Sequence, residues 1–157
     1  MAKTKQNSFF FESDEEAVRV LHQEGRKLKY CALKVWRKYL SSYRPKKYAR
    51  TGKSLKSIKL GKVKRLGVNE WGIEVTFIND LAYHDSVIGA SEPKGHAIML
   101  ISHGWKVKRG RHKDVYRFGY FEGFDYLGKV KEMYNNTKDR RVNLDIQWLG
   151  GKDYTKR

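Results

Sequence analysis

Residues 13–43 read SDEEAVRVLHQEGRKLKYCALKVWRKYLSSY, and this stretch decides the fold. Apolar or small side chains recur in it at steps of three or four, which is the period of one buried helix face. They are Ala17, Leu21, Gly25, Leu28, Ala32, Val35 and Tyr39. Ser13 and Glu16 form a capping box at the start, and Pro45 ends the pattern. We predict one continuous helix over residues 13–43, about 45 Å long at 1.5 Å per residue.

This helix is long for its domain. A compact sphere of this chain length is about 39 Å across, so the helix spans or overhangs the body that it belongs to. Two interpretations stay open at this point. Either Trp36, Tyr39 and Tyr43 contact a neighbouring copy of the chain, or the helix lies across its own sheet.

The segment after the helix has the pattern of a hairpin. Residues 55–66 alternate in patches, and Trp71, Ile73, Val75 and Phe77 alternate strictly with Gly72, Glu74 and Thr76. Strict alternation indicates a half-buried strand, and residues 67–70 supply the turn. Residues 79–94 carry turn residues and predict a loop with room for a short helical or strand piece. Residues 96–101 predict a short apolar strand or a helix turn.

The C-terminal third predicts one more helix and one more strand. Asp125 can cap a helix that ends at residues 135–136, and residues 142–148 alternate as a closing strand does. We therefore predict a single α+β domain over residues 1–157, in the order helix, strand, strand, insert, strand, helix, strand. The long helix and the second helix pack on one face of an antiparallel sheet. The parts are an arm (1–12), the long helix (13–43), the sheet with the second helix (50–148) and a polar tail (149–157).

The charge is strongly one-sided. Lys and Arg number 34 against 17 Asp and Glu, a formal net charge of +17, while 13% aromatic residues argue for a folded core. Ten Lys or Arg and no acid lie between Arg44 and Arg65, which favours contact with polyanions. The alternative is a solvated surface, or one that meets an acidic protein. Candidate DNA or partner contacts are first Lys106, Lys108, Arg109, Arg111 and Lys113, and then Lys46, Lys47, Arg50 and Lys53.

The middle of the chain is acidic by comparison. Such a segment beside basic flanks suits head-to-tail packing of identical subunits in a ring. The interface candidates are therefore Glu70, Glu74 and Asp85, together with Trp36, Tyr39 and Tyr43. Ring contacts and DNA contact are both kept as roles for the charged surfaces.

No pattern for catalysis, a metal or a cofactor stands out. The five histidines are scattered, Cys31 is the only cysteine, and Thr51-Gly52-Lys53-Ser54 lacks the earlier glycine of a P-loop. We expect no enzyme, no metal and no cofactor. No apolar run reaches the roughly 20 residues of a membrane span, and no secretory h-region precedes the helix, so we expect a chain kept in a reducing cytoplasm or in something assembled there.

A set of short motifs carries a resemblance. The long helix and its Pro-containing turn lead to residues 50–58 (RTGKSLKSI), then to Leu81-Ala82-Tyr83-His84-Asp85, to a Phe-Gly-Tyr-Phe block at residues 118–121 and to Tyr134-Asn135. Over residues 14–136 this resembles the tail-completion or head–tail joining proteins of long-tailed bacteriophages. Their pattern includes Thr-Gly-x-Leu-x-x-Ser-Ile, which has one extra residue here before Leu55. Their Ala-Tyr continues into Glu-Gly, whereas Ala82-Tyr83 continues into His84-Asp85.

The resemblance implies a function. Such neck, or connector, proteins are similar in fold to tail terminators and assemble as hexameric rings between the portal and the tail tube. They are structural virion proteins, made in the host cytoplasm, without catalytic activity. Expected partners are further copies of the chain, other neck, portal and tail-tube proteins, and double-stranded DNA in the lumen, with no membrane. The alternatives are a monomeric basic nucleic-acid-binding protein and, more remotely, a metal-dependent nuclease.

Overall fold

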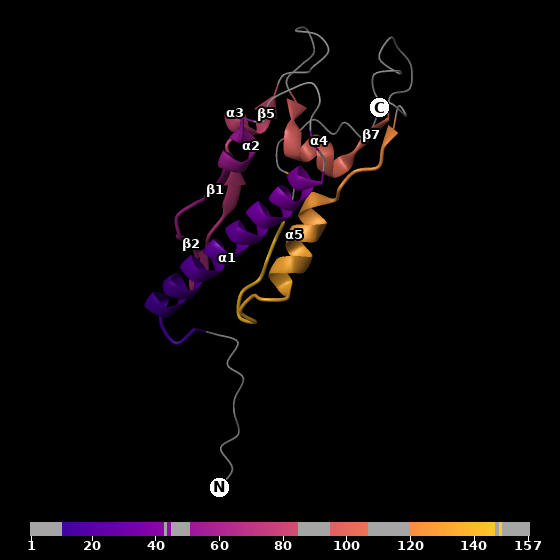
Figure 1. Cartoon of the computed structure of the whole chain (residues 1–157). Helices are drawn as coiled ribbons and strands as arrows, with labels where there is room; N and C mark the ends of the chain where they lie inside the picture. Colours follow the sequence, from indigo (N-terminus) through magenta and orange to yellow (C-terminus); the bar gives the residue numbers. More distant parts are fainter. Residues whose placement is uncertain are drawn as a thin grey trace.

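The computed structural model describes residues 11–42, 44, 51–84, 95–106, 120–146 and 148 (Figure 1). The described residues form five helices and eight short strands. In sequence they are α1 (Asp14–Ser41), α2 (Lys53–Lys56), β1 (Ile58–Leu60), β2 (Lys64–Gly67), β3 (Glu70–Gly72), β4 (Val75–Phe77), α3 (Asn79–Ala82), β5 (Tyr83–His84), β6 (Gly95–His96), α4 (Ala97–His103), β7 (Trp105–Lys106), β8 (Tyr120–Phe121) and α5 (Tyr126–Asn135).

The predicted long helix is confirmed as α1. It has 28 residues, which makes it about 42 Å long. The hydroxyl of Ser13 accepts a hydrogen bond of 3.1 Å from the backbone N–H of Glu16, as a capping box requires. The Glu16 carboxylate accepts from the backbone N–H of Glu12 at 2.9 Å, one residue before the predicted partner, Ser13.

The predicted hairpin is also confirmed, in two short ladders. Strand β1 pairs with β4, placing Lys59 opposite Thr76, and β2 pairs with β3 across the turn at Val68 and Asn69. An irregularity between Arg65 and Gly67 interrupts the register. Because side chains alternate between the two faces of a strand, Ile58 of β1 turns into the core and Lys59 turns to solvent.

Strand pairing elsewhere is minimal, and one predicted strand is wrong. Within the described ranges the strands form four separate antiparallel pairs, the other two being β5–β6 and β7–β8. Residues 142–146 are irregular, although Val142 is buried, Asn143 exposed and Leu144 half-buried. Alternating burial needs only one packed face, whereas a strand also needs a neighbouring edge for its backbone hydrogen bonds. The segment has the first property and lacks the second.

The structure settles one alternative that the sequence left open. The apolar run at residues 96–101 belongs to a helix, α4, which a two-residue strand precedes and Gly104 follows with a φ of 75°. The predicted second helix is confirmed as α5, with the Asp125 side chain accepting from the backbone N–H of Gly128. The chain thus has the predicted α+β class, with a long N-terminal helix, further helices and small antiparallel pairings.

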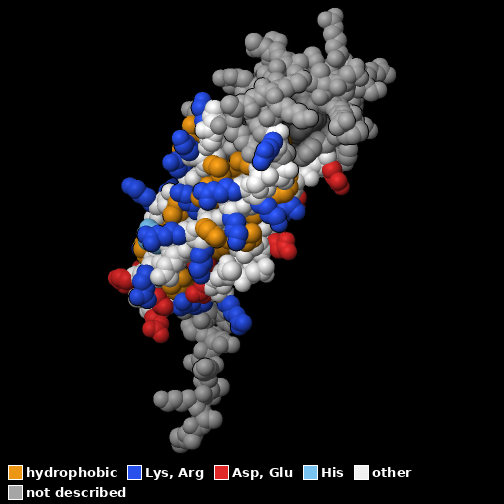
Figure 2. Space-filling view, viewed as in Figure 1, with side chains coloured by type: hydrophobic (Ala, Val, Ile, Leu, Met, Phe, Trp, Pro, Cys, Tyr) orange, Lys and Arg blue, Asp and Glu red, His pale blue; other side chains and the backbone are white. Residues whose placement is uncertain are grey.

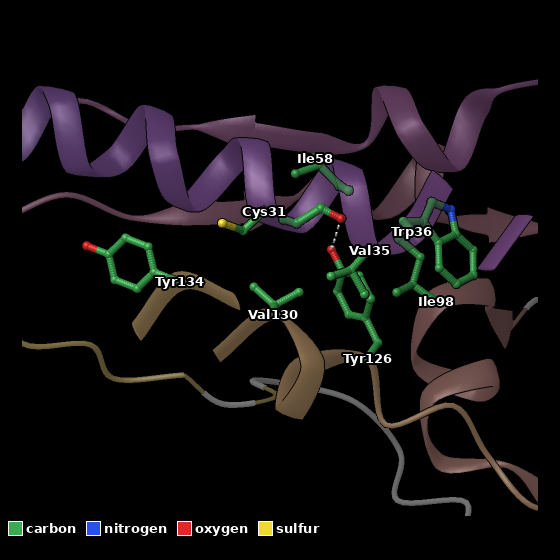
Figure 3. Close-up of a cluster of buried hydrophobic side chains, with 9 residues drawn as sticks. Cys31, Val35, Trp36, Ile58, Ile98, Tyr126, Val130 and Tyr134 are labelled. Carbon is green, nitrogen blue, oxygen red and sulfur yellow. Dashed lines mark hydrogen bonds between the residues drawn. The ribbon is translucent and has the colours of Figure 1, made fainter. Parts of the chain in front are cut away.

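The core lies where α1 meets α5 on one side and the hairpin on the other (Figure 1). Figure 3 shows Cys31, Val35 and Trp36 of α1 with side chains from three other elements. The phenol of Tyr126 crosses this core and donates a hydrogen bond of 3.0 Å to the backbone carbonyl of Ala32. A smaller cluster of Val20, Leu21 and Val142 lies nearer the start of α1.

The hairpin lies close to α1 at Gly25. A Cβ placed on Gly25 would lie 2.8 Å from side-chain carbons of Leu60 and of Ile73. A glycine therefore lets the two elements come together without a gap. This contact holds the hairpin against the helix, and it fixes which face of α1 remains open to solvent.

Candidate polyanion-binding surface

The chain has a long segment without any carboxylate side chain. After Glu24 the next acid is Glu70, and sixteen Lys or Arg lie between them. The described part of this segment forms most of α1, then α2, β1 and β2. Since α1 and β1 pack on each other, the positive charge is concentrated on one helix–hairpin unit. Such a unit attracts polyanions, and more strongly at low salt.

The solvent-facing side of α1 carries a straight row of charge. Arg19, Arg26 and Arg37 are all exposed, and they lie seven and eleven positions apart. At 3.6 residues per turn, these steps return to almost the same direction, so the three side chains leave the helix along one line of roughly 27 Å. We call Arg19, Arg26, Tyr30, Lys34 and Arg37 the α1 basic stripe. None of its four cations forms an ion pair with any described residue.

Tyr30 lies in the middle of this stripe. Its side chain is 58% exposed, on the side of α1 that faces away from the core. The ammonium of Lys34 lies 5.7 Å from the centroid of the Tyr30 ring, within the range of a cation–π contact. This contact holds the Lys34 charge over the helix surface.

The hairpin adds a second set of cations. Exposed basic side chains occur along α2, β1 and the following residues, namely Lys53, Lys56, Lys59 and Lys62. Lys64 is paired with the exposed carboxylate of Glu74 at 2.8 Å, and an ion pair so open to water is worth little. Figure 2 shows Lys and Arg side chains spread over the face that carries α1, with acidic ones gathered toward its lower end and its margin.

Three of the nearby acids, Glu24, Glu16 and Asp139, are engaged in structural contacts. Glu24 is buried and accepts hydrogen bonds from Lys27 and from Tyr134. Arg141 holds Asp139 through two nitrogens and reaches Glu16 at 3.0 Å. The Glu12 backbone N–H and then Arg141 lower the pKa of Glu16 below its ordinary value, and Arg141 lowers the pKa of Asp139. Glu24 and Asp139 are thus held by other partners, whereas Glu16 also interacts electrostatically with Arg19, so Arg26, Lys34 and Arg37 form the least compensated part of the α1 basic stripe.

Most of the predicted basic contacts fall on other parts of the chain. Lys53 is exposed at the first position of α2, and Lys106 is the last residue of β7. The remaining candidates lie outside the described residues: Lys46, Lys47, Arg50, Lys108, Arg109, Arg111 and Lys113. The structure thus leaves the two predicted clusters as predictions and adds a third basic surface on α1.

The structure buries Trp36, one of the interface candidates, within its own chain. Its side chain is only 2% exposed, and its indole N–H donates to the Ser54 hydroxyl at 2.9 Å. The residue faces the side of α1 on which α2 packs, so its ring fills the core of its own chain. Tyr39 is half-buried, stacks on Trp36 and lies 4.9 Å from the Phe124 ring.

Of the acidic interface candidates, Glu70 and Glu74 are exposed on the hairpin side of the molecule. Tyr43 and Asp85 lie outside the described residues. Exposure leaves both glutamates accessible to a partner, and it does not identify one.

The described residues show little that could support metal or thiol chemistry. No three His, Cys, Asp or Glu side chains among them come close enough to hold a metal ion. Cys31 is buried, and its burial raises the pKa of the thiol, which disfavours the nucleophilic thiolate. None of the described helices is both long and apolar enough to cross a membrane.

Sequence reasoning missed the α1 basic stripe, although its signal is present. The apolar positions of residues 13–43 define the buried side, and the remaining positions hold Arg19, Arg26, Lys34 and Arg37 at helical spacing. The charge was counted along the chain, where these four residues are diluted by their neighbours. Counted around the helix, they fall on one face.

No protein-family model, curated protein or solved structure matches this chain.

Proposed function

We propose that this chain is a ring-forming structural subunit of the neck of a long-tailed bacteriophage, without catalytic activity. In this role it links the portal or connector to the tail tube around the path of the DNA. The observation that carries the proposal is the positive surface of the packed helix–hairpin unit, most of whose exposed cations have no ion pair with a described residue. A protein that surrounds DNA without cutting or reading it needs this combination of fixed shape and positive charge.

The geometry of residues 51–58, which carry the resemblance to neck proteins, supports a structural role for that motif. Gly52 has a φ of 69°, a left-handed conformation that favours glycine, and it begins α2. Ser54 accepts the hydrogen bond from Trp36, while Ser57 is fully buried and its carbonyl accepts from the N–H of Ile78 at 2.8 Å. The motif thus joins α1, α2 and the hairpin.

The net charge suggests when the ring forms. Identical subunits of formal charge +17 repel one another in solution. Neutralisation by DNA, or docking on a ring that has already formed, would remove that repulsion. We therefore expect free protein to be monomeric at low salt and to assemble on the portal or the tail tube.

Particles made without this protein test the proposal. The expected result in negative-stain images is separate filled heads and finished tails, which added protein then joins. Joined, infectious particles in the absence of the protein would overturn the proposal. Turnover of a substrate by the purified chain would overturn it as well.

A second candidate function has one observation in its favour. The exposed Tyr30 among cations is the arrangement that a nucleic-acid-binding module uses, since bases stack on aromatic rings beside positive charge. In that case the chain acts as a monomer in the cytoplasm. Light scattering with virion proteins and with DNA separates the two. A monomer that binds DNA and ignores portal and tail proteins favours the module, whereas a partner-induced ring favours the neck subunit.

A further inference from the structure

We infer that the α1 basic stripe is a contact surface for the phosphate backbone of duplex DNA, read without regard to sequence. The inference rests on the proposed function, in which the subunit lies beside the DNA path. It names a surface on which none of the predicted basic contacts lies. Arg19, Arg26 and Arg37 are the principal contacts, with Lys34 beside them.

The arginines have the chemistry that phosphate recognition requires. A guanidinium offers a planar fork of N–H donors that can bind two phosphate oxygens at once. Arg19, Arg26 and Arg37 are exposed, and they have no ion pair with a described residue to break before binding. Little free energy is therefore lost in freeing these side chains for DNA. Each phosphate contact also releases condensed counterions from the DNA.

The geometry of the stripe suits a long polyanion. The three arginines follow one line of roughly 27 Å on a helix whose opposite face is fixed by the core. B-DNA carries one negative charge per about 1.7 Å of its axis, so phosphates are available all along such a line. A rigid row therefore makes several contacts at once without ordering a loop.

An acidic protein fits this surface less well. Protein interfaces have an apolar core with charge at the rim, whereas DNA interfaces are polar and strongly positive. On α1 the exposed large apolar side chain within the described residues is Tyr30 alone, and it lies among cations. Single-stranded nucleic acid binds best where successive bases stack on several aromatic rings, and this face of α1 has a single exposed ring, Tyr30.

The test is a salt titration of DNA binding by the isolated full-length protein. Fluorescence anisotropy with a labelled duplex of mixed sequence gives the affinity at several salt concentrations. The stripe variant Arg19→Gln/Arg26→Gln/Arg37→Gln removes three charges and keeps helix propensity nearly constant. We expect the slope of log affinity against log salt to become shallower by between two and three, at about 0.9 per phosphate contact. Affinity at 0.15 M salt should fall by about tenfold to 100-fold.

The matched control loses the same charge elsewhere. Lys129→Gln/Lys131→Gln/Arg140→Gln changes three exposed cations, two on α5 and one on the turn after α5. Its slope should become shallower by less than one. Equal effects of the two triple variants, with both proteins folded by circular dichroism, would overturn the inference, because binding would then follow total charge alone.

Two further probes decide between partners. Polyglutamate that binds the wild type as tightly as duplex DNA at equal salt, and that is weakened by the stripe variant, would identify an acidic protein partner instead. Single-stranded DNA that binds more tightly than the duplex, with loss on Tyr30→Ala, would identify a stacking site instead. Either result overturns the inference.

This inference and the proposed function fail separately. The salt slope is measured on the isolated chain and needs no particle, whereas the neck role is judged by whether heads and tails join. A stripe variant that still joins heads to tails but binds DNA like the wild type would refute the stripe and leave the neck role standing. Normal particles without the protein would refute the neck role whatever the slope.

Discussion

The phenol of Tyr134 donates a hydrogen bond of 2.8 Å to the buried carboxylate of Glu24, 110 positions earlier in the chain. Lys27 donates to the other oxygen of Glu24 and also to the backbone carbonyl of Thr137 at 3.3 Å. Burial, and then the neighbouring Glu24 carboxylate, raise the pKa of the Tyr134 phenol, so the phenol stays a donor at ordinary pH. This network joins the middle of α1 to the end of α5.

Tyr134→Phe should destabilise the fold by about 2 kcal/mol. The ring keeps its packing, but one oxygen of a carboxylate that is 3% exposed loses its donor, and a buried charge without its partner is costly. Urea unfolding monitored by circular dichroism measures the change. Tyr30→Phe, at an exposed position, is the control and should stay within about 0.5 kcal/mol of the wild type. A similar stability for both variants would mean that the Tyr134 bond contributes nothing.

Trp36→Ala should cost about 3–5 kcal/mol, because a large ring that is 2% exposed leaves a cavity when it is removed. Ser54→Ala should cost about 1 kcal/mol, since the indole N–H then loses its acceptor. Both are measured by urea unfolding. If Trp36→Ala leaves the monomer stable and weakens self-association instead, the ring belongs to a subunit interface and the assignment to the core is wrong.

Gly123→Ala should destabilise the chain by about 2 kcal/mol or more. Its φ is 95°, and a Cβ there would lie 2.8 Å from the carbonyl oxygen of Ser102 and 2.9 Å from that of His103. These are backbone atoms that cannot turn aside, and the hydrogen bond from the Asp125 N–H to Ser102 O would also be disturbed. The loss therefore combines conformational strain with a clash.

Gly52→Ala is the matched control for Gly123→Ala. Gly52 has a φ of 69°, but no atom lies within 4 Å of the place of its Cβ. It should therefore show the conformational cost alone, about 1 kcal/mol. Thermal unfolding compares the two variants, and an equal effect would show that the backbone contact at Gly123 relaxes.

Acid should destabilise the fold through Arg141. The ordinary pKa values are 4.5 for Glu16 and 3.8 for Asp139, and the folded state lowers both. Below the ordinary value the unfolded chain takes up protons more readily than the folded chain, so stability is lost as the pH falls. The contribution should be complete above about pH 5 and should disappear as each carboxylate protonates in the folded state.

Arg141→Gln removes the main cause of the lowered pKa of Asp139 and the second cause for Glu16. The variant should therefore lose less stability than the wild type between about pH 5 and pH 3. Urea unfolding at a series of pH values gives both curves. Parallel curves would show that Arg141 does not set the acid sensitivity. The Glu16 part that depends on the Glu12 N–H should persist in the variant.

The helices could be placed from the sequence because their signals are local. The Ser13 cap, the apolar period and Pro45 located α1, and Asp125 located the start of α5. The strict alternation from Trp71 to Phe77 located the hairpin partner of β1. Each of these signals lies within one helix or one hairpin, so residues near one another in sequence are enough to produce it.

Other features depend on what lies alongside in space. Residues 142–148 alternate as a strand does, yet no strand is assigned to the described part of that segment, because a ladder needs a partner edge that alternation cannot supply. Trp36 looks like an interface residue on a helix drawn alone, and only the docking of α2 places its indole against Ser54. For the charged surface, the sequence by itself determined that residues 25–69 contain no Asp or Glu. Which of those cations point outward along one line was decided by the tertiary structure, because packing against α5 and the hairpin selects the face of α1 that meets water.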